Sequence, residues 1–478
     1  MLTLANSALL SSLYDSHHWL LKLMETSKHM PVHNGALLEE EVRLSGANNT
    51  GISASDFLRK SGGVTVPNGI IRVSGAKNAA TRLMAAALIS DDPCYLSNFP
   101  TELVDVRHKA RFIESIGGSA VFHADTDALA IDASQLGSIQ PDSYSVPIRT
   151  TYLLAAGMLK RFGFARIPYP GGCKIGSRGY DLHVMLWEKM GCKVVEAADY
   201  IEITGTPRAF DVSFPISTIG GTENALICGS MLEGRTTIRN AYISPEVANL
   251  IEFLIAMGAR IQVVGNSFIE IQGSSTLRGT TFQVLPDRIE ALTWIVFGAI
   301  SRGNILIQDV PFGHMEIPMV HLREAGVDVF RNSHDAYVCP QSFINSTIQP
   351  FEVACGTHPG IISDMQPFFV LLALMADGIS RIYDYRYPER TAYLEQLSKF
   401  CPGAISWEPG KIVVNGRASL QGAEVVSTDL RGSMVLLLAA LIAEGESKIH
   451  NIQMALRGYN NLLSKLDQLG ISLELGNE

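Results

Sequence analysis

Apolar and polar positions repeat along the chain in one pattern, with a spacing of roughly 65–77 residues. Each copy opens with a polar or glycine-rich dipeptide and continues as an apolar segment of helical length. A glycine turn and a short alternating strand follow, and then an amphipathic helix that ends at another glycine. The pattern predicts six first helices, which begin near Ser74, Pro147, Gly220, Pro286, Ser363 and Thr428.

The strands and second helices of these units follow at comparable distances. We expect strands over residues 94–99, 165–170, 236–241, 305–310, 380–385 and 447–452. One-sided helices are clearest at 183–194, 250–261 and 462–473. The first helix of each unit is apolar on nearly every side, which is typical of a helix enclosed by other elements. The sequence therefore predicts an α+β arrangement in which six buried helices are surrounded by sheets and outer helices.

A solenoid of this period is an alternative, but the chain shows no polar capping repeats. We expect instead two closed pseudo-symmetric globules with three units in each. Residues 1–56 match none of the units and contain an acidic run at 39–41 and a stretch rich in Asn, Gly and Ser. We interpret them as an N-terminal extension that is weakly ordered or helical.

The composition narrows the class of protein. A chain of 478 residues is long enough for two or three domains. Its 47% apolar and 18% charged residues exclude a disordered chain. The 38 basic and 47 acidic side chains give a net charge of −9, which argues against a nucleic-acid-binding protein. An anionic ligand would therefore need a local cluster of Arg and Lys.

The cysteines and the apolar stretches indicate the compartment. Seven cysteines occur without a CxxC pair, which argues against a disulfide framework and against a zinc site. The N-terminus lacks a basic region followed by a clean apolar run and a small-residue cleavage site. No stretch reaches the about 18 uninterrupted apolar residues of a membrane span. We expect a soluble cytoplasmic protein.

Charged residues gather at the first turn of the predicted buried helices. Lys77, Arg149, Arg288 and Arg431 lie there. A positive charge at this end opposes the helix dipole, so these residues need another reason to be present. The N–H groups of six helix starts facing one site would suit a ligand with carboxylate or phosphate groups. The alternative is that the polar residues at these positions only cap the helices.

The loop PGGCKIGSRGYDLH, residues 170–183, is a second chemical signal. Lys174 and Arg178 lie within five residues of Cys173 and would favour its thiolate. We expect a chemical role for Cys173, whereas the other cysteines are interpreted as small apolar fillers. PGG is also compatible with a plain turn, and the glycines alone do not imply a nucleotide site.

Seven motifs in one order resemble the enolpyruvyl transferase family: SGAKNAA (74–80), PGGCKIGSRGYDLH (170–183), IGGTEN (219–224), PDRIEA (286–291), SDMQ (363–366), TDLR (428–431) and RGY (457–459). The resemblance extends from residue 57 to the C-terminus. It implies an inside-out α/β barrel with two globular domains, each of three βαβαββ-type units. One domain would span 77–284, and the other 57–76 plus 285–478.

The resemblance also implies a reaction. The enolpyruvyl group of phosphoenolpyruvate would pass to the 3-hydroxyl of UDP-N-acetylglucosamine with release of phosphate, the first committed step of peptidoglycan synthesis. No metal or organic cofactor is implied. The chemistry needs an acid for C3 of phosphoenolpyruvate, a base for the hydroxyl proton, and cations for the carboxylate and phosphate. The expected partners are these two small molecules, with no nucleic acid or membrane, in a monomer or weak homo-oligomer.

The motif matches assign roles to individual residues. Cys173 would donate the proton, and Asp364 would accept the hydroxyl proton. Asp429 would lie beside the reacting centre, and Lys77 and Arg431 would also act in catalysis. The residues assigned to phosphoenolpyruvate are Lys77, Asn78, Arg178, Arg431 and Arg457. The residues assigned to the UDP-sugar are Asn78, Arg149, Arg178, Gly179, Tyr180, Asp181, Leu182, His183, Thr218, Ile219, Gly220, Asp364, Arg386 and Arg390.

Three residues in the PDRIEA motif, Asp287, Arg288 and Glu290, are interpreted as mainly structural. Elsewhere the chain departs from the family pattern on the acceptor side. Ile216 stands where the family usually has a Lys before its diphosphate-binding segment, here residues 218–220.

Gly179 and Tyr180 replace the usual Pro-Val beside the uridine. Arg386 occupies a position where the family has an aliphatic residue that touches the nucleotide. Arg386 would supply the missing positive charge or fit a shorter nucleotide. Two alternatives therefore stay open: a paralogue that acts on UMP or another uridine nucleotide in secondary metabolism, and a non-catalytic nucleotide-binding protein.

Overall fold

A computed structural model describes residues 56–137, 148–169, 180–344 and 346–477 of the chain. The elements in these ranges form a mixed α/β fold with several sheets and two hydrophobic cores. The predicted extension lies outside the described residues except for Asp56, which already pairs in the first strand. None of the helices in these ranges is long and apolar enough to cross a membrane.

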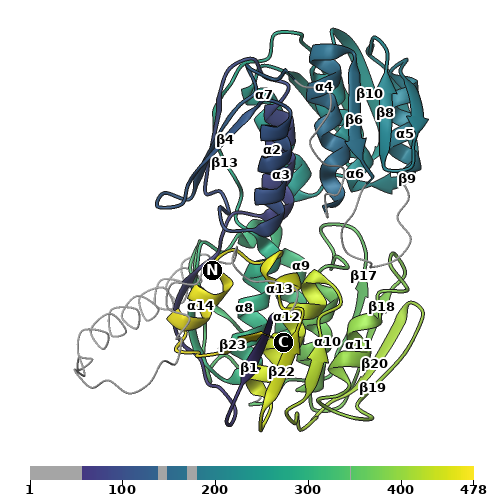
Figure 1. Cartoon of the computed structure of the whole chain (residues 1–478). Coiled ribbons are helices and arrows are strands. Elements are labelled where there is room, and N and C mark those ends of the chain that lie inside the picture. Colours follow the sequence, from purple (N-terminus) through teal and green to yellow (C-terminus); the bar gives the residue numbers. More distant parts are fainter. Residues whose placement is uncertain (1–55, 138–147, 170–179, 345, 478) are drawn as a thin grey trace, which may run out of the picture. The chain divides into compact units, whose positions relative to one another are not determined.

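The first core is built from residues between Ala76 and Val284 (Figure 1). Its helices are α2 (Lys77–Ala87), α3 (Val104–Ser115), the 3-10 helix η2 (Arg149–Leu154), α4 (Ala155–Phe162), α5 (Asp181–Lys189), α6 (Ile219–Ser230) and α7 (Pro245–Ala256). Its strands are β3 (Cys94–Ser97), β4 (Ser119–His123), β5 (Ala128–Asp132), β6 (Phe164–Pro168), β7 (Lys193–Glu196), β8 (Tyr200–Thr204), β9 (Asp211–Thr218), β10 (Gly234–Ala241), β11 (Arg260–Val264), β12 (Phe268–Gly273) and β13 (Thr281–Gln283). They form sheets in the orders β13-β3-β5-β4, β6-β8-β7 and β11-β12-β10-β9.

The second core combines two early strands with the chain from Ile289 onward. Its helices are α8 (Arg288–Ser301), the 3-10 helix η3 (Phe312–His314), α9 (Glu316–Glu324), α10 (Gln366–Leu374), α11 (Ala392–Leu397), α12 (Leu430–Ile442), α13 (Gln453–Leu456) and α14 (Leu462–Gln468). Its strands are β1 (Asp56–Lys60), β2 (Asn68–Arg72), β14 (Asn304–Gln308), β15 (Phe330–Arg331), β16 (Ala336–Val338), β17 (Glu352–Cys355), β18 (Ile379–Asp384), β19 (Ile405–Glu408), β20 (Lys411–Asn415), β21 (Glu424–Val426), β22 (Ser447–His450) and β23 (Glu474–Asn477). The sheet orders are β15-β16-β14-β2, β17-β18-β20-β19 and β21-β22-β1-β23.

The five four-stranded sheets of the described residues share one pairing pattern. Each contains one parallel pair and two antiparallel pairs, as in β17-β18-β20-β19, where only β17 and β18 run parallel. The strands expected from the alternating segments are present as β3, β6, β10, β14, β18 and β22. A recurring pattern in the sequence therefore corresponds to a recurring sheet.

The helices predicted to be buried are enclosed by sheets and other helices. Every residue of α8 and of α12 is buried, and α8, α10 and α12 contact one another. The unit after Pro147 differs from the expectation. Its helix begins as the 3-10 helix η2, with non-helical backbone at Thr150, before α4 continues.

The chain passes between the two cores at residues 74–76 and again at 285–287, and the two passages are hydrogen-bonded to each other. The backbone N–H of Ala76 donates to Leu285 O at 2.7 Å, and that of Asp287 donates to Ser74 O at 2.8 Å. A Cβ on Gly75 would lie 1.8 Å from Asn98 O, so this close approach requires glycine. The starts of α2 and α8 are thereby fixed side by side.

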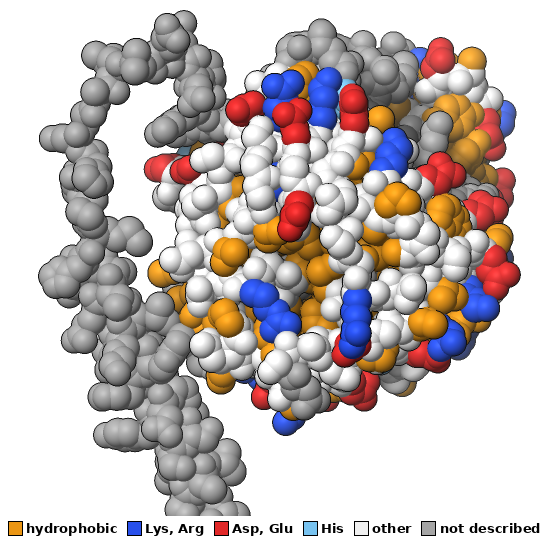
Figure 2. Space-filling model, turned by 90° about the horizontal axis from the view of Figure 1, so that it is seen from below, with side chains coloured by type: hydrophobic (Ala, Val, Ile, Leu, Met, Phe, Trp, Pro, Cys, Tyr) orange, Lys and Arg blue, Asp and Glu red, His pale blue; other side chains and the backbone are white. Residues whose placement is uncertain are grey.

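Apolar side chains on the outer faces of the sheets are interspersed with charged ones. Figure 2, which views the molecule from the lower end of Figure 1, shows apolar groups between Lys, Arg, Asp and Glu side chains. Ile379 of β18 is 52% exposed, although Ile382 of the same strand is fully buried. Single exposed apolar side chains are ordinary on a sheet face and do not by themselves mark a binding surface.

Gly157 gives a test of how closely the inner helices pack. In a helix interior, Gly→Ala normally stabilises by about 1 kcal/mol. A Cβ on Gly157 would lie 2.5 Å from Leu88 Cβ and 3.1 Å from Leu88 O. We therefore expect Gly157→Ala to lower the melting temperature, because α4 must move away from the end of α2.

Gly313→Ala is the matched control, since a Cβ there would meet no atom within 4 Å. Its melting temperature should stay close to that of the unmodified protein. A stabilised Gly157→Ala variant would contradict the close approach of α4 and α2.

Candidate functional site

One cavity of about 530 Å³ collects residues from the starts of all six buried helices. Its lining comes from α2, η2, α6, α8 and α12, and from the turn that precedes α10. Among the described residues, eight Lys and Arg and six Asp and Glu line it. The cavity thus has a positive balance on a chain of net charge −9, which favours an anionic ligand.

Most of the predicted site residues lie in this lining: Lys77, Asn78, Arg149, Asp181, Leu182, His183, Thr218, Ile219, Gly220, Asp364, Arg386, Arg390, Asp429, Arg431 and Arg457. Tyr180 is described but is not part of the lining. Cys173, Arg178 and Gly179 lie outside the described residues.

Asp364 lies between two arginines. Its Oδ1 is 2.9 Å from Arg390 Nη1, and its Oδ2 is 3.7 Å from Arg431 Nε. Burial by itself would raise the pKa of Asp364, but the charges of Arg390 and Arg431 lower that pKa well below its usual range. The carboxylate is therefore ionised. It becomes a stronger proton acceptor when a bound anion draws the charge of these arginines away.

Asp429 fixes the start of α12. It is the N-cap of that helix, and its Oδ1 accepts from the backbone N–H groups of Arg431 and Gly432 at 3.2 Å each. The same oxygen accepts from Arg390 Nη2 at 2.7 Å. A Cβ on Gly432 would lie 2.5 Å from Asp429 Oδ2, so glycine is needed beside this cap. The cap and the ion pair together place Arg390 and Arg431 on either side of Asp364.

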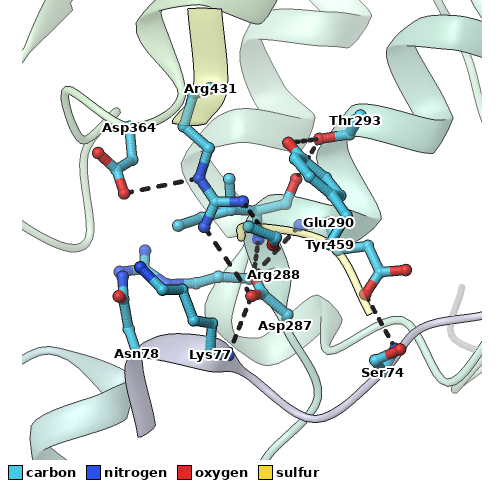
Figure 3. Close-up of polar contacts among 12 residues, drawn as sticks. Ser74, Lys77, Asn78, Asp287, Arg288, Glu290, Thr293, Asp364, Arg431 and Tyr459 are labelled. Carbon is cyan, nitrogen blue, oxygen red and sulfur yellow. Dashed lines mark hydrogen bonds and ion pairs between the residues drawn. The ribbon is translucent and has the colours of Figure 1, made fainter. Parts of the chain in front are cut away.

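Arg431 is almost fully buried and is held from several sides (Figure 3). Its Nη1 donates to Gly458 O at 3.3 Å, and its guanidinium lies 5.1 Å from the centre of the Tyr459 ring. Asp287 Oδ2 is 4.0 Å from its Nη2. Arg431 Nε makes no hydrogen bond within the described part of the chain and faces only Asp364. A buried donor of this kind marks a place where an anionic acceptor would be stabilised.

Lys77 and Arg457 approach one carboxylate. Lys77 Nζ lies 3.0 Å from Asp105 Oδ2, and Arg457 Nε donates to Asp105 Oδ1 at 2.8 Å. Lys77 is also the first residue of α2, and its backbone N–H donates to the Asp287 carboxylate at 3.4 Å (Figure 3). This small group of charges joins the starts of α2, α3 and α8.

Another part of the lining contains an aromatic stack. The His183 ring stacks on Tyr152, with ring centroids 3.7 Å apart, and Asn224 Nδ2 lies 3.3 Å from His183 Nδ1. Burial and, to a smaller extent, the charge of Arg149 together lower the pKa of His183 to about 3. A Cβ on Gly220 would lie 2.4 Å from the Tyr152 hydroxyl. The stack is thus neutral, and the first turn of α6 approaches it closely.

Arg386 reaches from the second core to the strand end before α6. Its Nη2 donates to Ser217 O at 2.8 Å, and its guanidinium lies 5.5 Å from the centre of the Tyr242 ring. The neighbouring Ile216 lines the cavity and is 63% exposed. An arginine therefore stands beside the position where a lysine was expected.

Two buried charge pairs in the lining were not found from the sequence. Arg288 pairs with Glu246 at 2.9 Å, although the sequence interpretation took Arg288 as mainly structural. Burial would raise the pKa of Glu246, but Arg288 lowers it to about 2. Arg82 pairs with Glu223 at 2.9 Å and lies 3.5 Å from Asn78 Oδ1.

The sequence did contain signals for Arg82 and Glu223. Arg82 follows Asn78 by four residues, which places both on one helix face, and Glu223 stands inside the quoted IGGTEN motif. No local pattern links Asp105 to Arg457, because 352 residues separate them. Asp287 and Glu290 behave as the sequence predicts. Asp287 caps α8, and Glu290 accepts from the Ser74 backbone N–H and pairs with Lys465.

The described residues contain no group of three or more His, Cys, Asp or Glu side chains that could hold a metal ion. The cavity offers cations instead. Its arrangement can bind an anion at Lys77, Arg431 and Arg457, and a planar uncharged group near the Tyr152–His183 stack.

Comparisons with known proteins find relatives over most of the chain. A family model described as EPSP synthase (3-phosphoshikimate 1-carboxyvinyltransferase) matches residues 63–466. The UDP-N-acetylglucosamine 1-carboxyvinyltransferase of Campylobacter hominis is 34% identical over 427 residues, which cover 88% of this chain and 100% of that protein. The protein of the same name from Nitratiruptor sp. is 35% identical over 427 residues, or 88% and 99%.

Two solved structures resemble the fold. The enolpyruvyl transferase NikO from Streptomyces tendae aligns with a TM-score of 0.79 at 22% identity, and covers 89% of this chain and 100% of that one. EPSP synthase from Acinetobacter baumannii aligns with a TM-score of 0.67 at 17% identity, and covers 88% and 100%. At these identities the likeness concerns the fold, and it confirms the predicted mixed α/β class.

His183 makes the folded protein sensitive to acid. Its pKa of about 3 in the folded state lies below the ordinary value of 6.5. Between these two pH values the unfolded chain binds a proton at this residue and the folded protein does not. The free energy of unfolding therefore falls by about 1.4 kcal/mol for each pH unit below about 6.5, as far as this group is concerned. We expect His183→Gln to lower the melting temperature at pH 7.5 and to lose less of it between pH 6.5 and 4.5.

His123→Gln, at an exposed position on β4, is the control and should keep the pH dependence of the unmodified protein. An equal loss of melting temperature in His183→Gln and in the unmodified protein would show that His183 is not buried in its neutral form.

Proposed function

The chain belongs to the EPSP synthase family, and we propose on this basis that it transfers the enolpyruvyl group of phosphoenolpyruvate to the 3-hydroxyl of UDP-N-acetylglucosamine with release of phosphate. The chain covers the whole length of the Campylobacter hominis relative, whose name describes this carboxyvinyl transfer. The observation that carries the proposal is the placement of the ionised Asp364 among the cations of one cavity.

The cations suit the first substrate. Phosphoenolpyruvate carries a carboxylate and a phosphate close together, and Lys77, Arg431 and Arg457 line one part of the cavity. Charge-assisted hydrogen bonds from Lys and Arg to such groups are the strong ones in proteins. Arg431 Nε, buried without a hydrogen-bond acceptor among the described residues, is one donor that the substrate would satisfy.

The residues divide the chemistry as follows. Cys173 donates a proton to C3 of phosphoenolpyruvate while the sugar 3-hydroxyl oxygen bonds to C2, and Asp364 takes the hydroxyl proton. The resulting tetrahedral carbon carries the phosphate, the carboxylate and the sugar. Loss of a proton from C3 then breaks the C2–O bond to phosphate, restores the double bond and releases inorganic phosphate. Arg431 and Lys77 stabilise the charge that develops on the leaving group.

The proposed acceptor site is the part of the lining around Tyr152, His183 and the start of α6. The Tyr152–His183 stack offers a flat, uncharged surface for a base, and residues 218–220 begin α6, whose N-terminal N–H groups favour a phosphate. Thr218 is the N-cap of this helix. Support for this assignment comes from the residues quoted in the family motifs.

We also infer the finer architecture. The shared pairing pattern of the four-stranded sheets and the likeness to NikO support an inside-out α/β barrel with three repeated units in each of two domains. The two hydrophobic cores support domains over 77–284 and over 57–76 plus 285–478. The cytoplasmic location, the monomeric or weakly oligomeric state and the absence of nucleic-acid binding stay predictions.

A phosphate-release assay tests the function. We expect the protein with phosphoenolpyruvate and UDP-N-acetylglucosamine to release inorganic phosphate, and expect much less release with UMP as the acceptor. Cys173→Ala should nearly abolish the signal, whereas Cys173→Asp should retain part of it, because an aspartic acid also donates a proton.

The outcomes separate the candidates. Phosphate release with UMP alone would favour the paralogue of secondary metabolism, for which the exposed Ile216 and Arg386 are the supporting features. Release with neither acceptor would favour a binding protein. Full activity of Cys173→Ala would remove this residue as the acid.

Arg386 supplies the charge that Ile216 lacks. Replacing Arg386 by Val should weaken UDP-N-acetylglucosamine binding by about 1.5–3 kcal/mol, the range of a charge-assisted hydrogen bond, or roughly tenfold to hundredfold in Kd. Ile216→Lys in that variant should recover part of the loss, since position 216 is exposed to the cavity. Isothermal titration with the nucleotide sugar measures both effects.

Arg381→Val is the control, because Arg381 lies on β18, the strand that precedes Arg386, and pairs with Glu352 outside the cavity. It should leave the Kd unchanged. Equal affinities of the Arg386→Val and Arg381→Val variants would show that Arg386 takes no part in binding the acceptor.

A further inference from the structure

Asp105 joins two cations that belong to different cores. Its Oδ2 lies 3.0 Å from Lys77 Nζ at the start of α2, and its Oδ1 accepts from Arg457 Nε at 2.8 Å at the end of α13. All three residues line the cavity. Neither the family motifs quoted above nor the sequence pattern gives Asp105 a role.

This arrangement is buried. The exposed fractions of the side chains are 7% for Asp105, 15% for Lys77 and 12% for Arg457. Burial alone would raise the pKa of Asp105, but the charges of Lys77 and Arg457 lower it, so the carboxylate is ionised. Two cations this close to each other repel, and both side chains are long and flexible. Their positions therefore depend on the carboxylate between them.

The segment that carries Asp105 is itself docked onto the turn after α13. The backbone N–H of Glu102 donates to Asn460 Oδ1 at 2.9 Å, in a buried contact. The same turn provides Gly458 O, which accepts from Arg431 Nη1. The start of α3 is thus tied to the backbone that also holds Arg431.

The contact with Asp105 does not use every donor of Lys77. The contact with Asp105 uses one N–H of the three on Lys77 Nζ and only Nε of the Arg457 guanidinium. The contact with Asp105 therefore leaves two N–H groups of the Lys77 ammonium unused. Asp105 can therefore keep its contacts while an anion is bound.

We propose that Asp105 is a positioning residue for phosphoenolpyruvate: it holds Lys77 and Arg457, one from each core, at the spacing that the substrate's carboxylate and phosphate require. The inference rests on the proposed function. Asp105 acts through the two cations and does not touch the substrate. It also links the two cores, because one carboxylate binds a residue of each.

Asp105→Asn removes the charge and keeps the size of the side chain. We expect the KM for phosphoenolpyruvate to rise at least about tenfold with a smaller fall in kcat, because binding of the anion loses its prearranged cations. The Kd for UDP-N-acetylglucosamine should stay within about twofold, since the Tyr152–His183 side of the cavity is unchanged. Asp105→Glu, which keeps the charge, should recover part of the KM.

Glu102→Gln is the matched control. Glu102 lies just before α3, is 8% exposed, and pairs with Arg107, which is not in the cavity lining. It should keep the KM of the unmodified protein. An equal rise of the KM in Glu102→Gln and Asp105→Asn would show that Asp105 acts only through the stability of α3. The melting temperatures of both variants are therefore measured as well.

Two further outcomes would overturn the inference. A lower KM in Asp105→Asn would mean that the carboxylate competes with the substrate for the cations. An unchanged KM would mean that Lys77 and Arg457 are held without it. Calorimetric titration and turnover of the unmodified protein with phosphoenolpyruvate and UDP-N-acetylglucosamine test the proposed function separately from the role of Asp105. A protein that binds and converts neither contradicts the proposed function and this inference with it, whereas normal turnover with an unaffected Asp105→Asn contradicts only the role of Asp105.

Discussion

Cations gathered in one partly buried cavity repel one another, and the carboxylates placed among them decide where each can lie. Asp364 separates Arg390 from Arg431, Asp105 joins Lys77 to Arg457, and buried acids pair with Arg288 and Arg82. Because the lining has fewer acids than bases among the described residues, positive charge is left for a ligand. An anion that enters therefore completes a network that is already largely paired and does not have to assemble one.

The backbone supplies this arrangement through the starts of its buried helices. Asp287 and Asp429 cap α8 and α12, so an arginine in the first turn of each helix is fixed relative to its cap. The hydrogen-bonded passages at 74–76 and 285–287 bring the starts of α2 and α8 together. The Lys77 backbone N–H consequently reaches the Asp287 carboxylate. The positions of the cations in the two cores are thus coupled through backbone as well as through ion pairs.

The sequence predicted those features that depend on local periodicity. A helix that is apolar on every side, such as α12, can be stable only inside a layer of other elements, and the alternating segments became β3, β18 and their equivalents. Motif residues such as Lys77 and Asp364 also meet in one cavity, as expected. Pairings between distant segments were not predictable, because nothing near Asp105 or Glu246 indicates which cation each will meet. The 3-10 helix η2 was not predicted for a related reason. Its backbone conformation depends on tertiary packing, whereas its apolar composition alone favours a regular α-helix.

Nearby positive charge lowers the pKa of two buried groups of the cavity, and it leaves one of them neutral and the other ionised. His183 is buried against Tyr152 with the positive charge of Arg149 nearby, so its pKa falls and it stays neutral. Asp364 is held between Arg390 and Arg431, so its pKa falls and it stays charged. A neutral stacked surface attracts a flat base without competing for the anion, while the charged side holds the anion without attracting the base. Under the proposed function, these two kinds of surface would take the two substrates, and the ionised Asp364 in the same lining would accept the hydroxyl proton.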